Sequence, residues 1–198
     1  SCELLHALVT AAIGFHAQNN DAYKKLLTSI FPCVLRLAVD GDPVSSQLFS
    51  PLIDQMIHWY TTKKEYVAVA DALLDAILGG IESQDNGKLR EASSKFLAGF
   101  VSWNLKGLTD PKDMEDPETV KGLLYRVYGL LNHPSATKRL GAYLAVKQLA
   151  SVLKQNASNH SAIVDQFLLE LLHNGIMSLR LCQHDQASMG TEKSAVDA

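Results

Sequence analysis

Apolar residues recur every three to four positions along almost the whole chain, which is the period of an amphipathic α-helix. One stripe joins Val44, Leu48, Leu52 and Met56, each four residues from the last. No segment alternates apolar and polar residues over six positions, as a half-buried strand would. The pattern therefore predicts an all-α fold.

Polar turns and helix-starting residues divide this pattern into eight helical segments. The predicted helices are residues 2–17, 22–39, 43–61, 66–82, 87–106, 118–131, 135–155 and 160–183. A further helix is expected to begin in the stretch Thr191-Glu192-Lys193-Ser194, after a turn. We expect each boundary to be accurate to about three residues.

Prolines support several of these boundaries, because proline fits the first turn of a helix but not its interior. Asp42-Pro43 and Asp116-Pro117 each place an N-cap acceptor before the proline. His133-Pro134 is likewise expected to put proline at a first helical position. Two further prolines, Pro32 and Pro51, lie inside apolar stripes and are expected to kink their helices rather than end them.

The helices fall into a repeated pattern. Val44, Leu89 and Thr137 take similar places near the starts of second helices, with spacings of 45 and 48 residues. HEAT and armadillo units, which are pairs or triplets of helices, repeat every 40–47 residues or so. The acidic, proline-bearing loop Thr109–Asp116 accounts for the longer spacing. The sequence therefore predicts a HEAT-like α-solenoid of antiparallel helix pairs.

The predicted repeat units are residues 22–61, 66–106, 118–155 and 160–198, with residues 1–17 as the second helix of a preceding unit. Each pair carries more apolar surface than it can bury alone, so neighbours must stack. Small residues near the second-helix starts should let these helices approach closely; they are Ala92, Ser93, Gly141 and Ala142. The apolar start, with Leu4, Leu5 and Leu8, leads us to expect further repeats before Ser1 and after Ala198.

Composition narrows the class of protein. Apolar residues make up 47% of the 198-residue chain and charged residues 20%, which is typical of a folded domain. The net charge of −3 argues against a surface devoted wholly to nucleic acid. The sequence contains no run of 18 apolar residues, so it predicts no membrane-spanning helix. Three widely spaced cysteines are typical of free thiols in a reducing compartment.

Catalytic and cofactor motifs give no candidate site. Gly79-Gly80 lacks the spacing of a phosphate-binding loop, and no kinase string or serine nucleophile elbow occurs. Cys182-Gln183-His184 and His173 do not have zinc-ligand spacing. We therefore expect no catalytic residue, no cofactor, no metal and no small-molecule substrate in this segment.

Two weaker hypotheses concern the surface. Basic residues near helix starts or turns could line a channel for DNA or an acidic partner; they are Lys63, Lys64, Lys138 and Arg139. A solvated face is the more common reason for such charges. Ser83, in a Ser-Gln dipeptide beside an acidic turn, is a candidate phosphorylation site, although chance explains such a dipeptide more simply.

Four stretches together resemble the helical-repeat region of the phosphatidylinositol-3-kinase-related kinases. They are Phe31–Ala38, Ile57–Tyr60, Leu73–Ile81 and His133–Ala142. The resemblance runs from about Leu4 to Gly190. It departs around Asp110–Asp116 and Gln155–Ser161, where the loops differ.

The resemblance implies a role within a larger protein. The family member concerned is a nuclear serine/threonine kinase that repairs DNA double-strand breaks by non-homologous end joining. Its N-terminal helical repeats form a ring-like cradle, and its kinase domain lies far downstream. The segment would then be a non-catalytic scaffold whose partner is the remainder of that chain, with the Ku heterodimer and DNA ends as partners of the whole.

A second interpretation stays open at this point. The same fold suits a generic HEAT-repeat adaptor that binds protein partners in transport or phosphatase assemblies. A reading frame that continues into a kinase domain would exclude that alternative.

Overall fold

A computed structural model describes residues 2–14, 21–39, 41–62, 66–107, 118–156, 161–185 and 190–198. Within these ranges the chain forms nine α-helices and no β-strand, which confirms the predicted all-α class. The helices are α1 (Cys2–Gly14), α2 (Asp21–Leu37), α3 (Pro43–Thr62), α4 (Val67–Ile81), α5 (Gly87–Gly107), α7 (Glu118–Leu131), α8 (Ala136–Asn156), α9 (Ser161–Cys182) and α10 (Thr191–Asp197). The insertion loop Thr109–Asp116 and the Asp116-Pro117 signal lie outside the described residues.

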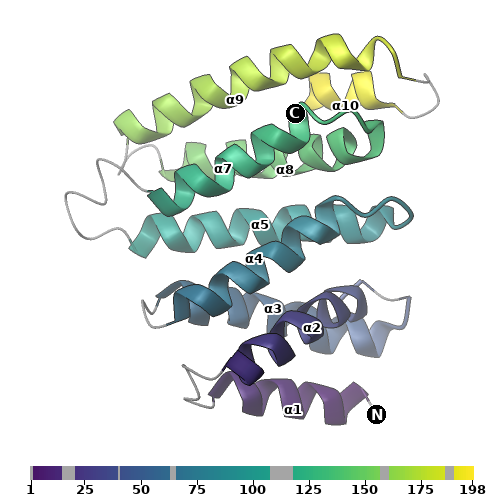
Figure 1. The fold of residues 1–198 in the computed structure, drawn as a ribbon, viewed down its shortest axis with the longest axis vertical. Helices are drawn as coiled ribbons and strands as arrows, with labels where there is room; N and C mark the ends of the chain where they lie inside the picture. The colour runs from purple at the N-terminus through teal and green to yellow at the C-terminus, as the bar shows by residue number, and fades with distance from the viewer. Residues whose placement is uncertain are drawn as a thin grey trace.

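The helices stack in two layers along the long axis of the molecule (Figure 1). In one layer α1, α3, α5, α8 and α10 follow one another, each in contact with the next. In the other layer α2 packs on α4, and α7 packs on α9. Within each antiparallel pair α2 contacts α3, α4 contacts α5, α7 contacts α8 and α9 contacts α10. The unit boundaries predicted from the sequence periodicity stay a prediction.

Side-chain caps start two of the second helices, α3 and α5. The Asp42 carboxylate accepts hydrogen bonds from the Ser45 backbone N–H at 3.1 Å and from the Ser45 hydroxyl at 2.9 Å. Pro43 follows as the first residue of α3, as predicted. At α5 the amide oxygen of Asn86 accepts from the Leu89 N–H at 3.0 Å. Each cap satisfies a backbone donor that the helix itself leaves unpaired.

The start of α8 differs from the prediction. Pro134 does not occupy the first helical position, because the helix begins at Ala136. The imidazole Nδ1 of His133 accepts a hydrogen bond from the Ser135 N–H at 2.9 Å, which holds the chain in a turn before the helix. By contrast, Pro32 and Pro51 do lie within α2 and α3, and neither ends its helix.

One connected cluster of buried apolar side chains runs through the stack from Val9 in α1 to Cys182 in α9. It contains fully buried phenylalanines of both layers, Phe31, Phe49 and Phe167. Every helix pair therefore shares its core with its neighbours, which is the expected property of a solenoid. Among the described helices, none combines the length and the apolar character that crossing a lipid bilayer would take.

Two of the predicted small residues, Gly141 and Ser93, lie at close contacts between helices. A Cβ added at Gly141 in α8 would collide with the backbone carbonyl oxygen of Ile81, the last residue of α4. A Cβ at Gly80 would collide with the hydroxyl of Ser93 in α5. The C-terminal end of α4 therefore lies directly against both α5 and the next second helix, α8.

Candidate functional site

Of the four basic residues proposed for DNA or partner contact, two lie in the described part of the chain, and these two differ in their surroundings. Lys63 and Lys64 lie outside the described residues. Lys138 and Arg139 are neighbours in the first turn of α8, but their side chains have different environments. The two must therefore be considered separately.

Lys138 lies at the surface and is already paired. Its Nζ is 2.6 Å from a carboxylate oxygen of Glu82, which directly follows α4, and about a quarter of the side chain is exposed. The pair joins two successive helix pairs of the stack. Contact between Lys138 and DNA stays a prediction, and such contact would compete with Glu82.

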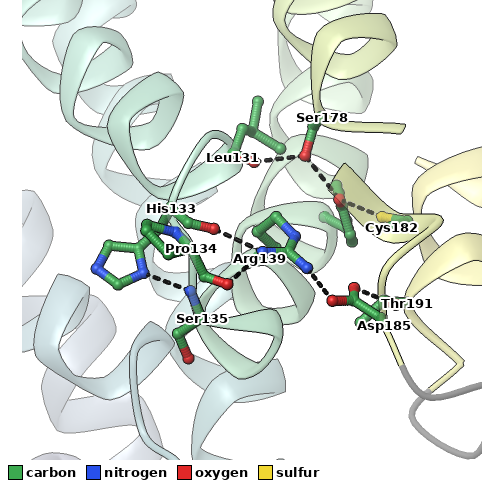
Figure 2. A network of polar contacts seen from close by, with 10 residues as sticks. Leu131, His133, Pro134, Ser135, Arg139, Ser178, Cys182, Asp185 and Thr191 are labelled. Atoms are coloured by element: carbon green, nitrogen blue, oxygen red, sulfur yellow. Dashed lines mark hydrogen bonds and ion pairs between the residues drawn. The ribbon is translucent and has the colours of Figure 1, made fainter. Parts of the chain in front are cut away.

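Arg139 does not point to the surface, so its predicted role as a DNA or partner contact needs correction. Only 1% of its surface is exposed, the lowest value of any charged residue in the described part of the chain. Its Nη1 donates to the backbone carbonyls of His133 and Pro134, both at 2.7 Å, and its Nη2 forms a short ion pair with Asp185 (Figure 2). The guanidinium thus joins the turn before α8 to the turn after α9.

Asp185 in turn fixes the start of α10. Its second carboxylate oxygen accepts a hydrogen bond from the hydroxyl of Thr191, the first residue of α10, at 2.7 Å (Figure 2). Burial tends to raise the pKa of the Asp185 carboxyl, but the hydrogen bonds from Arg139 and Thr191 outweigh it and lower that pKa below its ordinary value. The carboxylate is therefore held ionised between two turns.

A second chain of polar contacts lies beside the first. The Ser178 hydroxyl of α9 donates to the backbone carbonyl of Leu131, so its proton is not free for another bond. The Tyr143 hydroxyl, 2.6 Å from Ser178 Oγ, must then be the donor in that pair. Its oxygen is 2.9 Å from Cys182 Sγ, where it can accept the thiol proton. Figure 2 shows Ser178 between Leu131 and the rest of this chain, which ends at Cys182.

The environment of Tyr143 perturbs its ionisation. Burial, with the Cys182 contact adding to it, raises the pKa of Tyr143 to about 12. Ionisation would remove the donor to Ser178 and leave a charge in the core. The residue therefore serves as a neutral connector between helices at ordinary pH.

Two further pairs join the same two helix pairs on the α7–α9 side. The Tyr128 hydroxyl donates to the Glu170 carboxylate at 3.2 Å, and the Asn132 side-chain amide donates to Asn174 at 3.0 Å. Burial and the nearby Glu170 charge raise the pKa of Tyr128 above its ordinary value. In both pairs the two residues are 42 positions apart in the sequence. The two contacts therefore share the same alignment of α7 against α9.

Ser83, the candidate phosphorylation site, lies in the turn between α4 and α5. It is partly exposed and lines a cavity of about 580 Å³ between α2 and α4, together with Thr28, Arg36 and Asp75. Its backbone carbonyl accepts a hydrogen bond from Arg90 Nη1 at 2.7 Å, which anchors the turn. Phosphorylation of Ser83 stays a prediction.

The described residues contain no group of three or more His, Cys, Asp or Glu side chains placed to hold a metal ion. Cys33 and Cys182 are both free thiols. His133, whose backbone carbonyl accepts from Arg139, uses its Nδ1 to hold the turn before α8. The perturbed and buried polar groups described above thus join helices and turns, and we find no arrangement among them that could activate a nucleophile.

Sequence reasoning missed most of this network. Ser178, Cys182 and Asp185 are far from Arg139 in sequence, and no local motif links them. One signal was present: an arginine one turn into a second helix occurs twice, at Arg90 and Arg139.

Comparisons with known proteins place these features in a family. Residues 21–198 match the family model described as "DNA-dependent protein kinase catalytic subunit, CC1/2". The chain is 36% identical over 205 residues to the DNA-dependent protein kinase catalytic subunit of Gallus gallus, and that match covers 100% of this chain. The corresponding protein of Dictyostelium discoideum is 36% identical over 184 residues, covering 90% of this chain.

The chain spans about 5% of the length of the Gallus gallus and Mus musculus relatives, so it corresponds to a small part of them. The matched region is named CC1/2 and is helical throughout its described elements here. Since the family model matches most of this chain, the chain belongs to the DNA-dependent protein kinase catalytic subunit family, in its CC1/2 region.

Proposed function

We propose that this segment is a non-catalytic helical scaffold within a DNA-dependent protein kinase catalytic subunit, a nuclear serine/threonine kinase of double-strand break repair by non-homologous end joining. The supporting observation is the use of its buried polar groups. Arg139 and Tyr143 bind across helix pairs, to Asp185 and Ser178, and Asp185 also binds Thr191 at the start of α10. Such groups fix the geometry of a stack rather than perform chemistry.

Uncovered apolar surface supports the same proposal. Leu4 and Leu8 of α1 are 64% and 59% exposed, and Met177 of α9 is 43% exposed. These residues lie on the first and the last long helix of the stack (Figure 1). In a solenoid, such faces are covered by neighbouring repeats. Direct partners would thus be other parts of the longer kinase chain, and the Ku heterodimer and DNA ends would be partners of the whole kinase.

The test uses the full-length kinase with Arg139→Ala, compared with Arg126→Ala at an exposed ion pair. A scaffold role predicts a lower thermal midpoint and weaker DNA end joining for Arg139→Ala. The KM for ATP should be unchanged, because the proposal gives no residue of the segment a role in binding the nucleotide. A raised KM for ATP at unchanged thermal midpoint would overturn the proposal, as would ATP hydrolysis by the 198-residue chain alone.

A further inference from the structure

An apolar groove runs between α8 and α9 beside the end of α10. Its volume is about 410 Å³. Val146 and Ala150 of α8 form one wall, and Leu168, Leu172 and Ile176 of α9 form the other. Its lining is much more apolar than that of the cavity beside Ser83, which includes two aspartates and an arginine.

The groove is open to solvent although its lining suits a protein core. Leu172 is 61% exposed and Ile176 is 54% exposed, and Val196 of α10 is 71% exposed at its end. Leaving several large apolar side chains exposed side by side is unfavourable, by about 25 cal/mol for each Å² of apolar surface. Such a patch marks a contact surface.

The position and direction of α10 indicate what covers it. This helix starts at the turn fixed by Asp185 and Thr191 and heads back along α8, so that its end lies between α8 and α9 (Figure 1). Ala198 itself lines the groove. A helix that continues from Ala198 would therefore enter the groove directly.

The dimensions of the groove fit such a helix. One face of α9 carries a row of apolar side chains spaced four residues apart: Leu168, Leu172 and Ile176. At 1.5 Å per residue, this wall is about 12 Å long, which a partner helix covers with roughly eight residues. A covalently connected helix also has a large advantage over a separate partner, because its effective concentration at the groove is in the millimolar range or above.

We propose that the residues that follow Ala198 in the longer kinase chain extend α10 by two to three turns and fill this groove, with apolar side chains at three- and four-residue spacing against Val146, Leu168 and Leu172. This inference rests on the proposed function, since it places the segment within the longer chain. It goes further by assigning the groove to one occupant in the same chain.

Hydrogen exchange at the amides of residues 195–198 tests the proposal. These amides should exchange at least tenfold more slowly in the full-length kinase than in the 198-residue chain, because the extended helix protects them. In the full-length kinase, Leu172→Glu should remove most of that protection. Leu169→Glu is the matched control, since Leu169 is similarly exposed on the same helix but does not line the groove.

Three results would overturn the proposal. The first is equal exchange at these amides in the two proteins. The second is equal loss of protection in Leu172→Glu and Leu169→Glu. The third is a dimer of the 198-residue chain in sedimentation that Leu172→Glu abolishes and Leu169→Glu does not, which would assign the groove to a second copy. None of these readouts depends on kinase activity, so they are independent of the KM test of the scaffold role.

Discussion

Arg90 and Arg139 occupy the same position in successive helix pairs and bind their turns in the same way. The backbone N–H of each donates to its N-cap residue, Asn86 or Ser135. Arg90 Nη1 donates to the carbonyls of Ser83 and Gln84 at 2.7 and 3.0 Å, as Arg139 does to two carbonyls of its own turn.

In the α2–α3 pair, a shorter side chain makes the equivalent contact with the turn. Ser46, whose N–H donates to the N-cap Asp42, directs its hydroxyl at the carbonyl of Ala38, 3.0 Å away. In all three pairs the residue four positions after the N-cap therefore ties the turn to the second helix. Among contacts between described residues, Arg139 alone of these three adds a side-chain bond to the next pair, through Asp185.

Arg139→Ala should be among the most destabilising single substitutions in the segment. It removes a buried ion pair and leaves Asp185 without its main partner, which typically costs about 3–5 kcal/mol. Arg126→Ala removes the ion pair with Asp75, where both side chains are about half exposed, and should cost under about 1 kcal/mol. Urea unfolding of the 198-residue chain measures both. Similar midpoints for the two variants would contradict the role assigned to Arg139.

Gly141→Ala should destabilise the chain, even though alanine is the better helix former. The added Cβ would meet the Ile81 carbonyl oxygen, so α4 and α8 must separate. Gly99→Ala in α5 is the control, because no atom lies within 4 Å of its added Cβ. That substitution should stabilise the chain by about 0.5–1 kcal/mol. Thermal midpoints compare the two, and an increase for both variants would exclude the tight contact at Gly141.

Stability should fall in alkali through Tyr143. Its pKa is about 12 in the folded chain and about 10 when unfolded, so the folded state favours the protonated form. The resulting stability is complete below pH 10 and is lost as pH rises toward 12, by about 2–3 kcal/mol at most. Urea midpoints between pH 8 and 11.5 measure how steeply stability falls with pH. The fall should be less steep in Tyr143→Phe.

The slope in Tyr143→Phe should not vanish, because the pKa of Tyr128 is also raised. Tyr125→Phe, at a side chain that is 62% exposed, serves as the comparison. An identical pH slope in wild type and Tyr143→Phe would show that Tyr143 does not contribute.

The side-chain cap of α5 should contribute about 1 kcal/mol to the free energy of unfolding. Asn86→Ala removes the acceptor for the Leu89 N–H and leaves that donor without a side-chain partner. Asn86→Asp keeps an acceptor at the same place and should retain most of the stability. Urea unfolding distinguishes the two. Equal losses would mean that Asn86 acts through something other than its side-chain oxygen.

The helices and their order could be predicted from sequence, because apolar spacing and N-cap residues are local signals. The repeat alignment was slightly off: Val44 and Thr137 follow their N-caps by two residues, but Leu89 follows Asn86 by three. Apolar spacing alone does not separate these two positions, whereas the cap hydrogen bonds do.

The direction of Arg139 could not be predicted in the same way. Lys138 and Arg139 are adjacent basic residues, so their charge alone predicts the same surface contact for both. Their neighbours decide the outcome: Lys138 faces Glu82 at the surface, while Arg139 lies one residue further around α8, toward α9 and Asp185. Asp185 is 46 residues away, and only the stacking of the pairs brings it near.

Different kinds of polar contact join successive helix pairs of the stack, and this difference has a mechanical consequence. We call the contact between two successive pairs a joint. Solvent-exposed ion pairs, such as Arg126–Asp75, cross from the α4–α5 pair to the α7–α8 pair, whereas buried hydrogen bonds and the Arg139–Asp185 pair cross from α7–α8 to α9–α10. Exposed pairs break and re-form at little cost. Under load, the first joint should therefore resist sliding mainly through the packing of α5 on α8 and the fit of Gly141 against Ile81, whereas the second joint should also resist through buried polar bonds that sliding would break.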